Sequence, residues 1–158
     1  MNSRLKIAGV VTALGLLAIA LVGRYEGYKP YAYRDPVGIW TACYGETKGI
    51  RPGMKFTKEE CGTMFLGGLT RHEGGMRKCL KDPDALPDET YLSFLSLTYN
   101  IGTGGFCKSS VRKLANAGDL PAACHAILKW NKAGGRVLKG LVTRRASEKK
   151  LCLKGLAK

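Results

Sequence analysis

The sequence is poor in acidic residues and in histidine, and its cysteines lack the spacing of a zinc site. Only 12 of its 158 residues are Asp or Glu, against 26 Lys and Arg, so the formal net charge is +14. His72 and His125 are the only histidines, and no CxxC pair occurs. Zinc sites need closer Cys and His spacing than this, so we expect no metal site.

The chain also lacks internal repeats and low-complexity linkers. Its length fits one domain of ordinary size, and 45% hydrophobic residues are enough to bury a core. The basic excess favours an anionic partner, which could be nucleic acid, a membrane face or an acidic wall polymer. Charge alone does not choose among the three.

The six cysteines indicate disulfides formed in an oxidising compartment, with six reduced and buried thiols as the alternative. Cys61 and Cys79 fall within one expected helix, which would separate them by ~27 Å, whereas a disulfide needs Cα atoms within ~7 Å. These two are therefore not expected to pair with each other. We expect the pairs Cys43–Cys61, Cys79–Cys107 and Cys124–Cys152, the last of which would join two neighbouring C-terminal helices.

No charged residue occurs from Ile7 to Gly23, and the basic Arg4 and Lys6 precede this apolar run. Basic residues before an apolar segment favour an orientation with the N-terminus inside the cytoplasm and the rest of the chain outside. As a helix the run would span ~25 Å, less than the ~30 Å of a hydrocarbon core. We expect residues 1–23 to form a weakly held inner-membrane anchor and residues 24–158 to form the functional domain.

Two other interpretations of the apolar run stay open. Ala18-Ile19-Ala20 resembles an A-x-A cleavage site, so the run could be a signal peptide that is removed after Ala20. A buried helix of a cytosolic protein is disfavoured by the flanking basic residues and by the cysteines.

The rest of the sequence predicts an α+β fold that is mainly helical, with a small antiparallel sheet near the front. Alternating residues around the turn Asp35-Pro36-Val37-Gly38 predict short strands over 31–46. The capping-box sequence Thr57-Lys58-Glu59-Glu60 opens a helix that runs to about Leu80. Further helices are expected over 87–101, 109–118, 119–130 and 140–153, with a loop over 102–105. Ser109 or Ser110 is expected to cap the second of these helices, and Asp119 with Pro121 is expected to open the third.

Glu26 and Asp35 lie nine residues apart just after the apolar run, and Thr41 follows six residues later. Two carboxyl groups and a hydroxyl suit glycoside hydrolysis, in which one acid protonates the leaving oxygen and an ionised partner activates water or attacks the sugar. Glu26, at the end of an apolar helix, is the natural acid, and Asp35, in a polar turn, is the natural ionised partner. Thr41 could hold the attacking water. Purely structural roles for the two acids are the alternative.

Several motifs around these residues occur in a fixed order. They are Glu26-Gly27, Tyr31-x-Tyr33-x-Asp35-x-x-Gly38-x-Trp40-Thr41-x-x-Tyr44-Gly45, Tyr99-Asn100-Ile101-Gly102, Gly105-Phe106 and Gly140-Leu141-x-Thr143-Arg144-Arg145-x-x-Glu148. Together they resemble the phage-type lysozymes, glycoside hydrolase family 24, over residues 24 to about 153. The resemblance implies a two-lobed fold and a muramidase that cuts the β-1,4 bond after N-acetylmuramic acid in peptidoglycan. It implies no metal and no cofactor.

The resemblance also implies roles for individual residues. Glu26 would be the general acid, Asp35 the base that activates water with inversion, and Thr41 the residue that positions this water. The residues expected to face the substrate from the helical lobe are Tyr99, Asn100, Phe106 and Ser109. Many relatives have Gly-His-Thr where this chain has Gly45-Glu46-Thr47, which makes Glu46 a second candidate for the base.

The paired arginines Arg144 and Arg145 have two interpretations. They could form a solvated basic face, or one of them could order the acidic end of the Glu26 helix. The remaining basic residues would hold the enzyme on the anionic wall.

The apolar run leads almost directly into Glu26, and in this the chain resembles the signal-anchor-release endolysins. The resemblance implies an enzyme that is tethered and inactive until loss of the membrane potential releases it into the periplasm, with a holin acting only indirectly. No cysteine lies in the run, so we expect topological control rather than disulfide exchange. We expect a monomer. The competing functions are a non-catalytic wall-binding or membrane-active protein of the same fold, and a nucleic-acid binder, which export disfavours.

Overall fold

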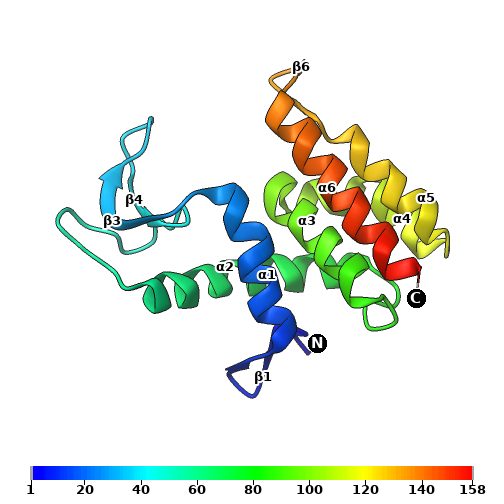
Figure 1. Cartoon of the computed structure of the whole chain (residues 1–158), viewed down its shortest axis with the longest axis horizontal. Coiled ribbons are helices and arrows are strands. Elements are labelled where there is room, and N and C mark those ends of the chain that lie inside the picture. The colour runs from blue at the N-terminus through cyan, green and yellow to red at the C-terminus, as the bar shows by residue number, and fades with distance from the viewer. Residues whose placement is uncertain (1, 158) are drawn as a thin grey trace. The chain divides into compact units, whose positions relative to one another are not determined.

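The structure, a computed structural model, describes residues 2–157 and divides into two compact units (Figure 1). One unit is Asn2–Arg71, and the other begins at His72 and continues to the C-terminal end. The boundary falls within the helix α2, Lys58–Cys79. The predicted α+β fold with mainly helical structure is confirmed, but the sequence predicted one small antiparallel sheet and residues 2–157 contain three, each of two strands.

The unit Asn2–Arg71 carries two small β-hairpins, one helix between them and the first part of α2. Its core is formed by Ala42, Cys43, Ile50 and Cys61, with aromatic and aliphatic side chains packed around them. The Cys43–Cys61 disulfide crosses this core and joins β4 to α2. The elements before α2 are β1 (Lys6–Ile7), β2 (Val10–Val11), α1 (Ala13–Glu26), β3 (Lys29–Arg34) and β4 (Trp40–Cys43).

The apolar run over residues 7–23 is not one continuous helix, which corrects the expectation from the sequence. Its first part forms the β1–β2 hairpin, whose turn contains the left-handed residues Ala8 and Gly9. The helix α1 begins only after Thr12, whose hydroxyl accepts a hydrogen bond from the Gly15 backbone N–H at 3.1 Å. A threonine side chain that caps the first turn satisfies a helix donor that has no partner within the helix, which explains the start of α1 at Ala13.

The hairpin is held against the first turn of α1 by backbone contacts. The Thr12 N–H donates to the Leu5 carbonyl at 2.9 Å, and the Leu5 side chain is buried. Gly15 lies against the same Leu5 carbonyl so closely that a Cβ at this position would collide with it. Within the described residues 2–157, no helix combines the length and the apolar character needed to cross a membrane.

The helix α2 begins as its capping-box sequence predicts. The Thr57 N–H donates to Glu60 Oε2 at 2.7 Å, and the Glu60 N–H donates to Thr57 Oγ1 at 3.1 Å. This reciprocal pair satisfies two backbone donors at the helix start. The helix ends at Cys79, within one residue of the expected end.

The unit that begins at His72 is helical except for one small hairpin. It contains the end of α2, then α3 (Asp88–Lys108), α4 (Ser110–Asn116), α5 (Leu120–Ala126), the 3₁₀ turn η1 (Ile127–Lys129), β5 (Lys132–Ala133), β6 (Arg136–Val137) and α6 (Lys139–Leu156). The loop expected over 102–105 is wrong. Only Gly102 leaves helical geometry, with φ +79°, and helical structure resumes through Lys108. A single glycine at positive φ is enough to kink the helix without ending it.

The contact between α3 and α6 includes hydrogen bonds from two hydroxyl groups of α3 to backbone carbonyls of α6. Ser93 Oγ donates to the Glu148 carbonyl at 2.6 Å, and Thr90 Oγ1 donates to the Cys152 carbonyl at 3.0 Å. The remaining two disulfides, Cys79–Cys107 and Cys124–Cys152, lie in this unit. With Cys43–Cys61 they are the three pairs expected from the sequence.

Candidate active site

Glu26 is the last residue of α1, and the packing three residues earlier fixes this end of the helix. Gly23 lies against Tyr44 and Phe65, so a Cβ there would be 3.2 Å and 3.5 Å from their rings. The Tyr44 and Phe65 rings are 4.6 Å apart between centroids. Glu26 is partly buried, and Gly27 ends the helix at φ +74°. The absence of a side chain at Gly23 therefore sets how closely the Glu26 end of α1 approaches these aromatic residues.

Asp35 lies in the turn between β3 and β4, and one oxygen of its carboxylate organises that turn. Asp35 Oδ1 accepts hydrogen bonds from the N–H groups of Val37 at 3.0 Å and Ile39 at 2.8 Å. The Asp35 N–H donates in turn to the Ile39 carbonyl at 2.9 Å. Across residues 2–157, Oδ2 accepts no hydrogen bond from the protein, and the side chain is partly exposed. One oxygen is thus held in place while the other is left for a water or a substrate.

Thr41 lies on β4, opposite Tyr33 of β3 in the antiparallel pair. Its hydroxyl donates to the Ile39 carbonyl at 3.1 Å, and its side chain is nearly buried. A hydroxyl has one proton, so donation to Ile39 leaves its lone pairs to accept a hydrogen bond. The structure therefore connects Thr41 and Asp35 through one residue, Ile39, whose N–H binds Asp35 and whose carbonyl binds Thr41.

Glu46, the second candidate base, belongs to a tight turn that follows β4. The Ala42 N–H donates to the Glu46 carbonyl and the Glu46 N–H donates to the Ala42 carbonyl, both at 2.9 Å. Gly45 adopts φ +98° within this turn. The turn places a partly buried acid after Thr41, and the candidacy of Glu46 as a base stays a prediction.

The residues expected on the helical side divide into two pairs. Tyr99 is partly exposed and its ring packs on His72 at 4.7 Å between centroids, while Asn100 is exposed. Phe106 is fully buried against Phe94, with ring centroids 5.9 Å apart. The Phe106 side chain has no exposed surface, and its expected contact with a substrate stays a prediction.

Ser109 is also buried, and its hydroxyl has a structural role. Ser109 Oγ accepts a hydrogen bond from the Arg112 N–H at 3.1 Å and donates to the Phe106 carbonyl at 2.7 Å. It therefore caps α4, as the sequence predicts. Contact of the four residues with a substrate stays a prediction, and Tyr99 and Asn100 are the two with more exposed side chains.

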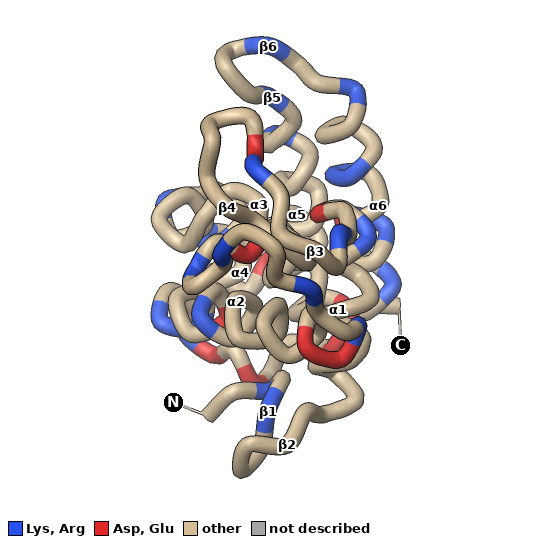
Figure 2. The backbone as a smooth tube through the Cα atoms, turned by 90° about the vertical axis from the view of Figure 1, so that its left-hand side faces the viewer, with Lys and Arg blue, Asp and Glu red and all other residues tan. Residues whose placement is uncertain are grey.

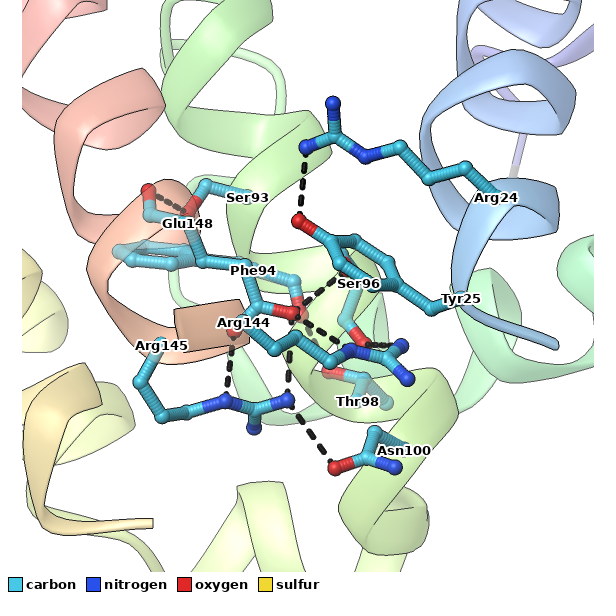
Figure 3. Close-up of polar contacts among 10 residues, drawn as sticks. All are labelled: Arg24, Tyr25, Ser93, Phe94, Ser96, Thr98, Asn100, Arg144, Arg145 and Glu148. Carbon is cyan, nitrogen blue, oxygen red and sulfur yellow. Dashed lines mark hydrogen bonds and ion pairs between the residues drawn. The ribbon is translucent and has the colours of Figure 1, made fainter. Parts of the chain in front are cut away.

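Arg144 and Arg145 do not form a solvated basic face, because both side chains are buried. Both are in contact with Glu148 (Figure 3). Glu148 lies on the same helix and is itself buried. Arg144 Nε is 3.2 Å from Glu148 Oε1, and Arg145 Nε is 2.9 Å from Oε2. Burial raises the pKa of Glu148, while Arg145, the Ser96 hydroxyl and Arg144 act in the opposite direction. An ordering of the Glu26 helix end by one of these arginines stays a prediction.

Two features of the site escaped the sequence analysis. The ion triad of Arg144, Arg145 and Glu148 has helical i,i+3 and i,i+4 spacing, which was visible in the sequence and could have identified it. The second feature is a buried network in which Tyr91 donates to Glu73 at 2.6 Å and accepts from Arg77 at 3.2 Å. No local pattern signals this network, because its members come from two helices.

The described residues contain no group of three or more His, Cys, Asp or Glu side chains arranged to hold a metal ion. Lys and Arg residues are spread over the helices and loops of both units, with few acidic positions between them (Figure 2). Basic residues distributed in this way suit contact with an extended anionic polymer more than one compact anionic ligand.

A family model described as "Phage lysozyme" matches residues 23–148. The chain belongs to the phage lysozyme family. The match begins three residues before Glu26 and ends at Glu148, so it contains each candidate residue named above. As a member of this family, the protein is a lysozyme-type hydrolase.

Individual phage lysozyme relatives cover nearly the whole chain. The SAR-endolysin of Bacteriophage PS119 is 36% identical over 155 residues, which cover 94% of this chain and 90% of that protein. The P22 lysozyme mutant L86M superposes with a TM-score of 0.78 at 30% identity and covers 87% of this chain and 95% of its own. The active form of the P1 phage endolysin Lyz superposes with a TM-score of 0.78 at 26% identity. The match covers 88% of this chain and 84% of that chain.

Proposed function

We propose that this phage lysozyme is an endolysin that hydrolyses the β-1,4 bond between N-acetylmuramic acid and N-acetylglucosamine in peptidoglycan. The observation that carries the catalytic part is the connection of Asp35 and Thr41 through Ile39. This connection holds the Asp35 carboxylate and the Thr41 hydroxyl on one rigid support. Membership of the family and the endolysin relatives support the activity and the substrate.

The proposed step follows from the proton balance of a water at this site. The water donates one hydrogen bond to Asp35 Oδ2 and the other to Thr41 Oγ1, whose own proton is already used on Ile39. Its oxygen lone pair is then directed to the anomeric carbon of the sugar, and Asp35 accepts the proton as the new C–O bond forms. Glu26 donates its proton to the departing glycosidic oxygen, and the configuration at the anomeric carbon is inverted.

The activity assay is wall lysis by the purified full-length chain and by three variants. Glu26→Gln and Asp35→Asn should each lower the rate at least a hundredfold, because each removes a proton donor or acceptor from the reaction. Glu46→Gln is the matched control, and it should leave most of the activity. If Glu46→Gln abolishes lysis while Asp35→Asn does not, Glu46 is the base. Unchanged lysis by Glu26→Gln would favour a non-catalytic wall-binding protein.

The stereochemical outcome has its own measurement. Proton NMR of a soluble glycan during the first turnovers should show the α-anomer of the new reducing end before mutarotation. The β-anomer appearing first would mean a retaining mechanism and a nucleophilic acid, so that the water-activation step above would be wrong.

We also propose that residues 1–23 anchor the enzyme in the inner membrane with its catalytic domain, residues 24–158, in the periplasm, and that it is active only after release. The described fold supports this, because part of the apolar run is used in packing, with Leu14, Ala18 and Val22 buried on α1. A bilayer-spanning run cannot make these contacts at the same time. Release would therefore allow α1 to assemble and to place Glu26 at its end.

Cleavage after Ala20 is the competing interpretation of this segment. It would remove the Thr12 cap and two buried side chains, Leu14 and Ala18, and would leave only the last six residues of α1. Intact mass of the membrane and soluble fractions, before and after collapse of the membrane potential, separates the two. Full-length protein that moves from an inactive membrane fraction to an active soluble fraction supports release. A soluble product that begins at Leu21 would show a cleaved signal peptide.

A further inference from the structure

A series of polar contacts connects the buried carboxylate of Glu148 with the exposed residue Asn100 in the helical unit (Figure 3). Its carboxylate receives a hydrogen bond from Ser96 Oγ at 2.6 Å and lies within 3.2 Å of nitrogen atoms of Arg144 and Arg145. Arg145 Nη2 donates to Asn100 Oδ1 at 3.0 Å, and Asn100 is exposed. A fully buried acid is thus connected through one arginine to an exposed amide.

The guanidinium of Arg145 is fixed at more than one atom. Its Nε lies 2.9 Å from Glu148 Oε2, and its Nη2 lies 3.3 Å from Glu148 Oε1. Nη2 carries two hydrogens, so one can be directed to Glu148 and the other to Asn100. The ion pair at Nε and the two hydrogen bonds of Nη2 together restrict the rotation of the guanidinium.

This arrangement determines which end of the Asn100 amide points outward. Arginine has only donors, so the atom that faces Arg145 must be the Asn100 oxygen and not its nitrogen. The Asn100 Nδ2 group donates to no protein atom among residues 2–157. Asn100 therefore presents two N–H donors to the solvent, in an orientation that the buried arginine maintains.

We propose that Glu148 is a positioning residue for substrate: it orients Arg145, which turns the Asn100 N–H donors toward carbonyl oxygens of the glycan. This rests on the proposed function, because the glycan is the substrate class named there. Peptidoglycan offers such oxygens on acetamido groups and on the lactyl-peptide branch, and both accept hydrogen bonds from an amide. Glu148 does not touch the substrate, and its effect passes through Arg145.

The alternative is that Glu148 only stabilises the contact between α3 and α6. Ser93→Ala is a matched control for that role. Ser93 Oγ donates to the Glu148 backbone carbonyl, so this variant loosens the same contact between the helices and leaves the carboxylate in place. Glu148→Gln keeps an acceptor for Ser96 but removes the charge that orients Arg145.

The experiment measures KM and kcat on solubilised, uncrosslinked glycan strands for full-length protein in its active form. Glu148→Gln should raise KM by up to about tenfold with kcat within a factor of two or three, the size expected when a hydrogen bond between two neutral groups is lost. Ser93→Ala should lower the melting temperature without changing KM. In the Asn100→Ala background, Glu148→Gln should raise KM no further, because the two residues act through one contact.

Asn100→Asp tests the amide orientation without disturbing the buried triad. An aspartate keeps an oxygen on Arg145 but has no N–H donor for the glycan, so KM should rise to the value of Asn100→Ala. If Glu148→Gln does not fold, Asn100→Asp still tests whether the Asn100 N–H donors bind the glycan. A chitooligosaccharide has acetamido groups but no lactyl-peptide branch. Loss of binding in Asn100→Asp on this ligand assigns the acceptor to the acetamido group, and loss only on peptidoglycan strands assigns it to the branch.

Two results would overturn the proposal. Additive increases in KM for Glu148→Gln and Asn100→Ala would show that they act independently, and an unchanged KM for Asn100→Asp would show that its donors are not used. Failure of the proposed function looks different, because the unmutated protein would then not cleave the glycan at all.

Discussion

Gly155 of α6 packs directly against Thr90 of α3. A Cβ at Gly155 would lie 2.7 Å from Thr90 Oγ1 and 3.0 Å from the Thr90 backbone nitrogen. The Thr90 hydroxyl is itself committed to the Cys152 carbonyl at 3.0 Å. A glycine is therefore what allows the two helices to approach each other next to the Cys124–Cys152 disulfide.

Replacement of Gly155 by alanine should lower the free energy of unfolding by ~1–3 kcal/mol, because the added methyl forces the two helices apart. The control is Gly104→Ala on α3, where a Cβ meets no atom within 4 Å. Alanine there should be neutral or should stabilise by ~0.5–1 kcal/mol, since it reduces the freedom of the unfolded chain. Denaturant unfolding of both variants measures this. Equal stability of the two would contradict the close packing at Gly155.

Thr41→Val should reduce wall lysis by a factor on the order of 10²–10³, because it keeps the shape of the side chain but removes the hydroxyl that would hold the water. Thr41→Ser keeps the hydroxyl and its bond to the Ile39 carbonyl, so it should retain most of the activity. Initial rates on purified sacculi measure the effect, and circular dichroism checks the fold. Similar rates for the valine and serine variants would remove Thr41 from the mechanism.

Gly15→Leu should leave the protein membrane-bound and inactive. In the described fold a side chain at Gly15 collides with the Leu5 carbonyl, and in lipid a leucine strengthens the anchor. Ala20→Leu is the matched control: Ala20 is exposed, so leucine there should strengthen the anchor without obstructing the fold.

The two variants are compared by fractionation and by activity after extraction with a mild detergent. Extraction should restore lysis to Ala20→Leu but not to Gly15→Leu. If both regain full activity, the contact between Leu5 and Gly15 is not needed for the active fold.

Tyr91 should make the folded state lose stability in alkaline solution. Burial, together with a hydrogen bond to Glu73, raises the pKa of Tyr91 well above its usual value near 10. Because the unfolded chain then ionises first, the stabilisation is complete below pH ~10 and is lost as the pH rises toward the folded-state pKa. By pH 11 the loss should be on the order of 1 kcal/mol.

The measurement for Tyr91 is the difference in unfolding free energy between the unmutated protein and Tyr91→Phe, taken from pH 8 to 11. The phenylalanine variant is less stable at pH 8 because Glu73 and Arg77 each lose a partner. The gap should narrow as the pH rises above 10. A gap that stays constant would show that Tyr91 ionises equally in both states.

The features that sequence reasoning predicted correctly depend on short-range chemistry. The capping box at Thr57 and Glu60, the caps at Ser109 and Asp119, and the turn at Asp35 involve residues within a few positions of one another. Helix length excluded one cysteine pair, because Cys61 and Cys79 lie near opposite ends of one helix. The three pairs themselves were a prediction, which the structure confirms. Short-range contacts can be read from the sequence because their geometry is nearly the same in any fold.

What sequence reasoning did not show is burial, which depends on neighbours far away in the sequence. Phe106 and Ser109 lie in a motif shared with lysozymes, yet the packing against Phe94 and the cap of α4 place them inside. Arg144 and Arg145 look like a solvated pair until Glu148 and the serines of α3 are brought beside them.

The sequence by itself therefore determined the family, the candidate acids and most helix ends, because each depends on a local pattern or on a fixed order of motifs. Only the tertiary structure decided that the apolar run folds as a hairpin followed by a helix, and that a buried acid reaches the surface through Arg145 and Asn100. These features depend on which segments pack together, and a backbone carbonyl such as that of Leu5 acts on Gly15 only after the chain has folded.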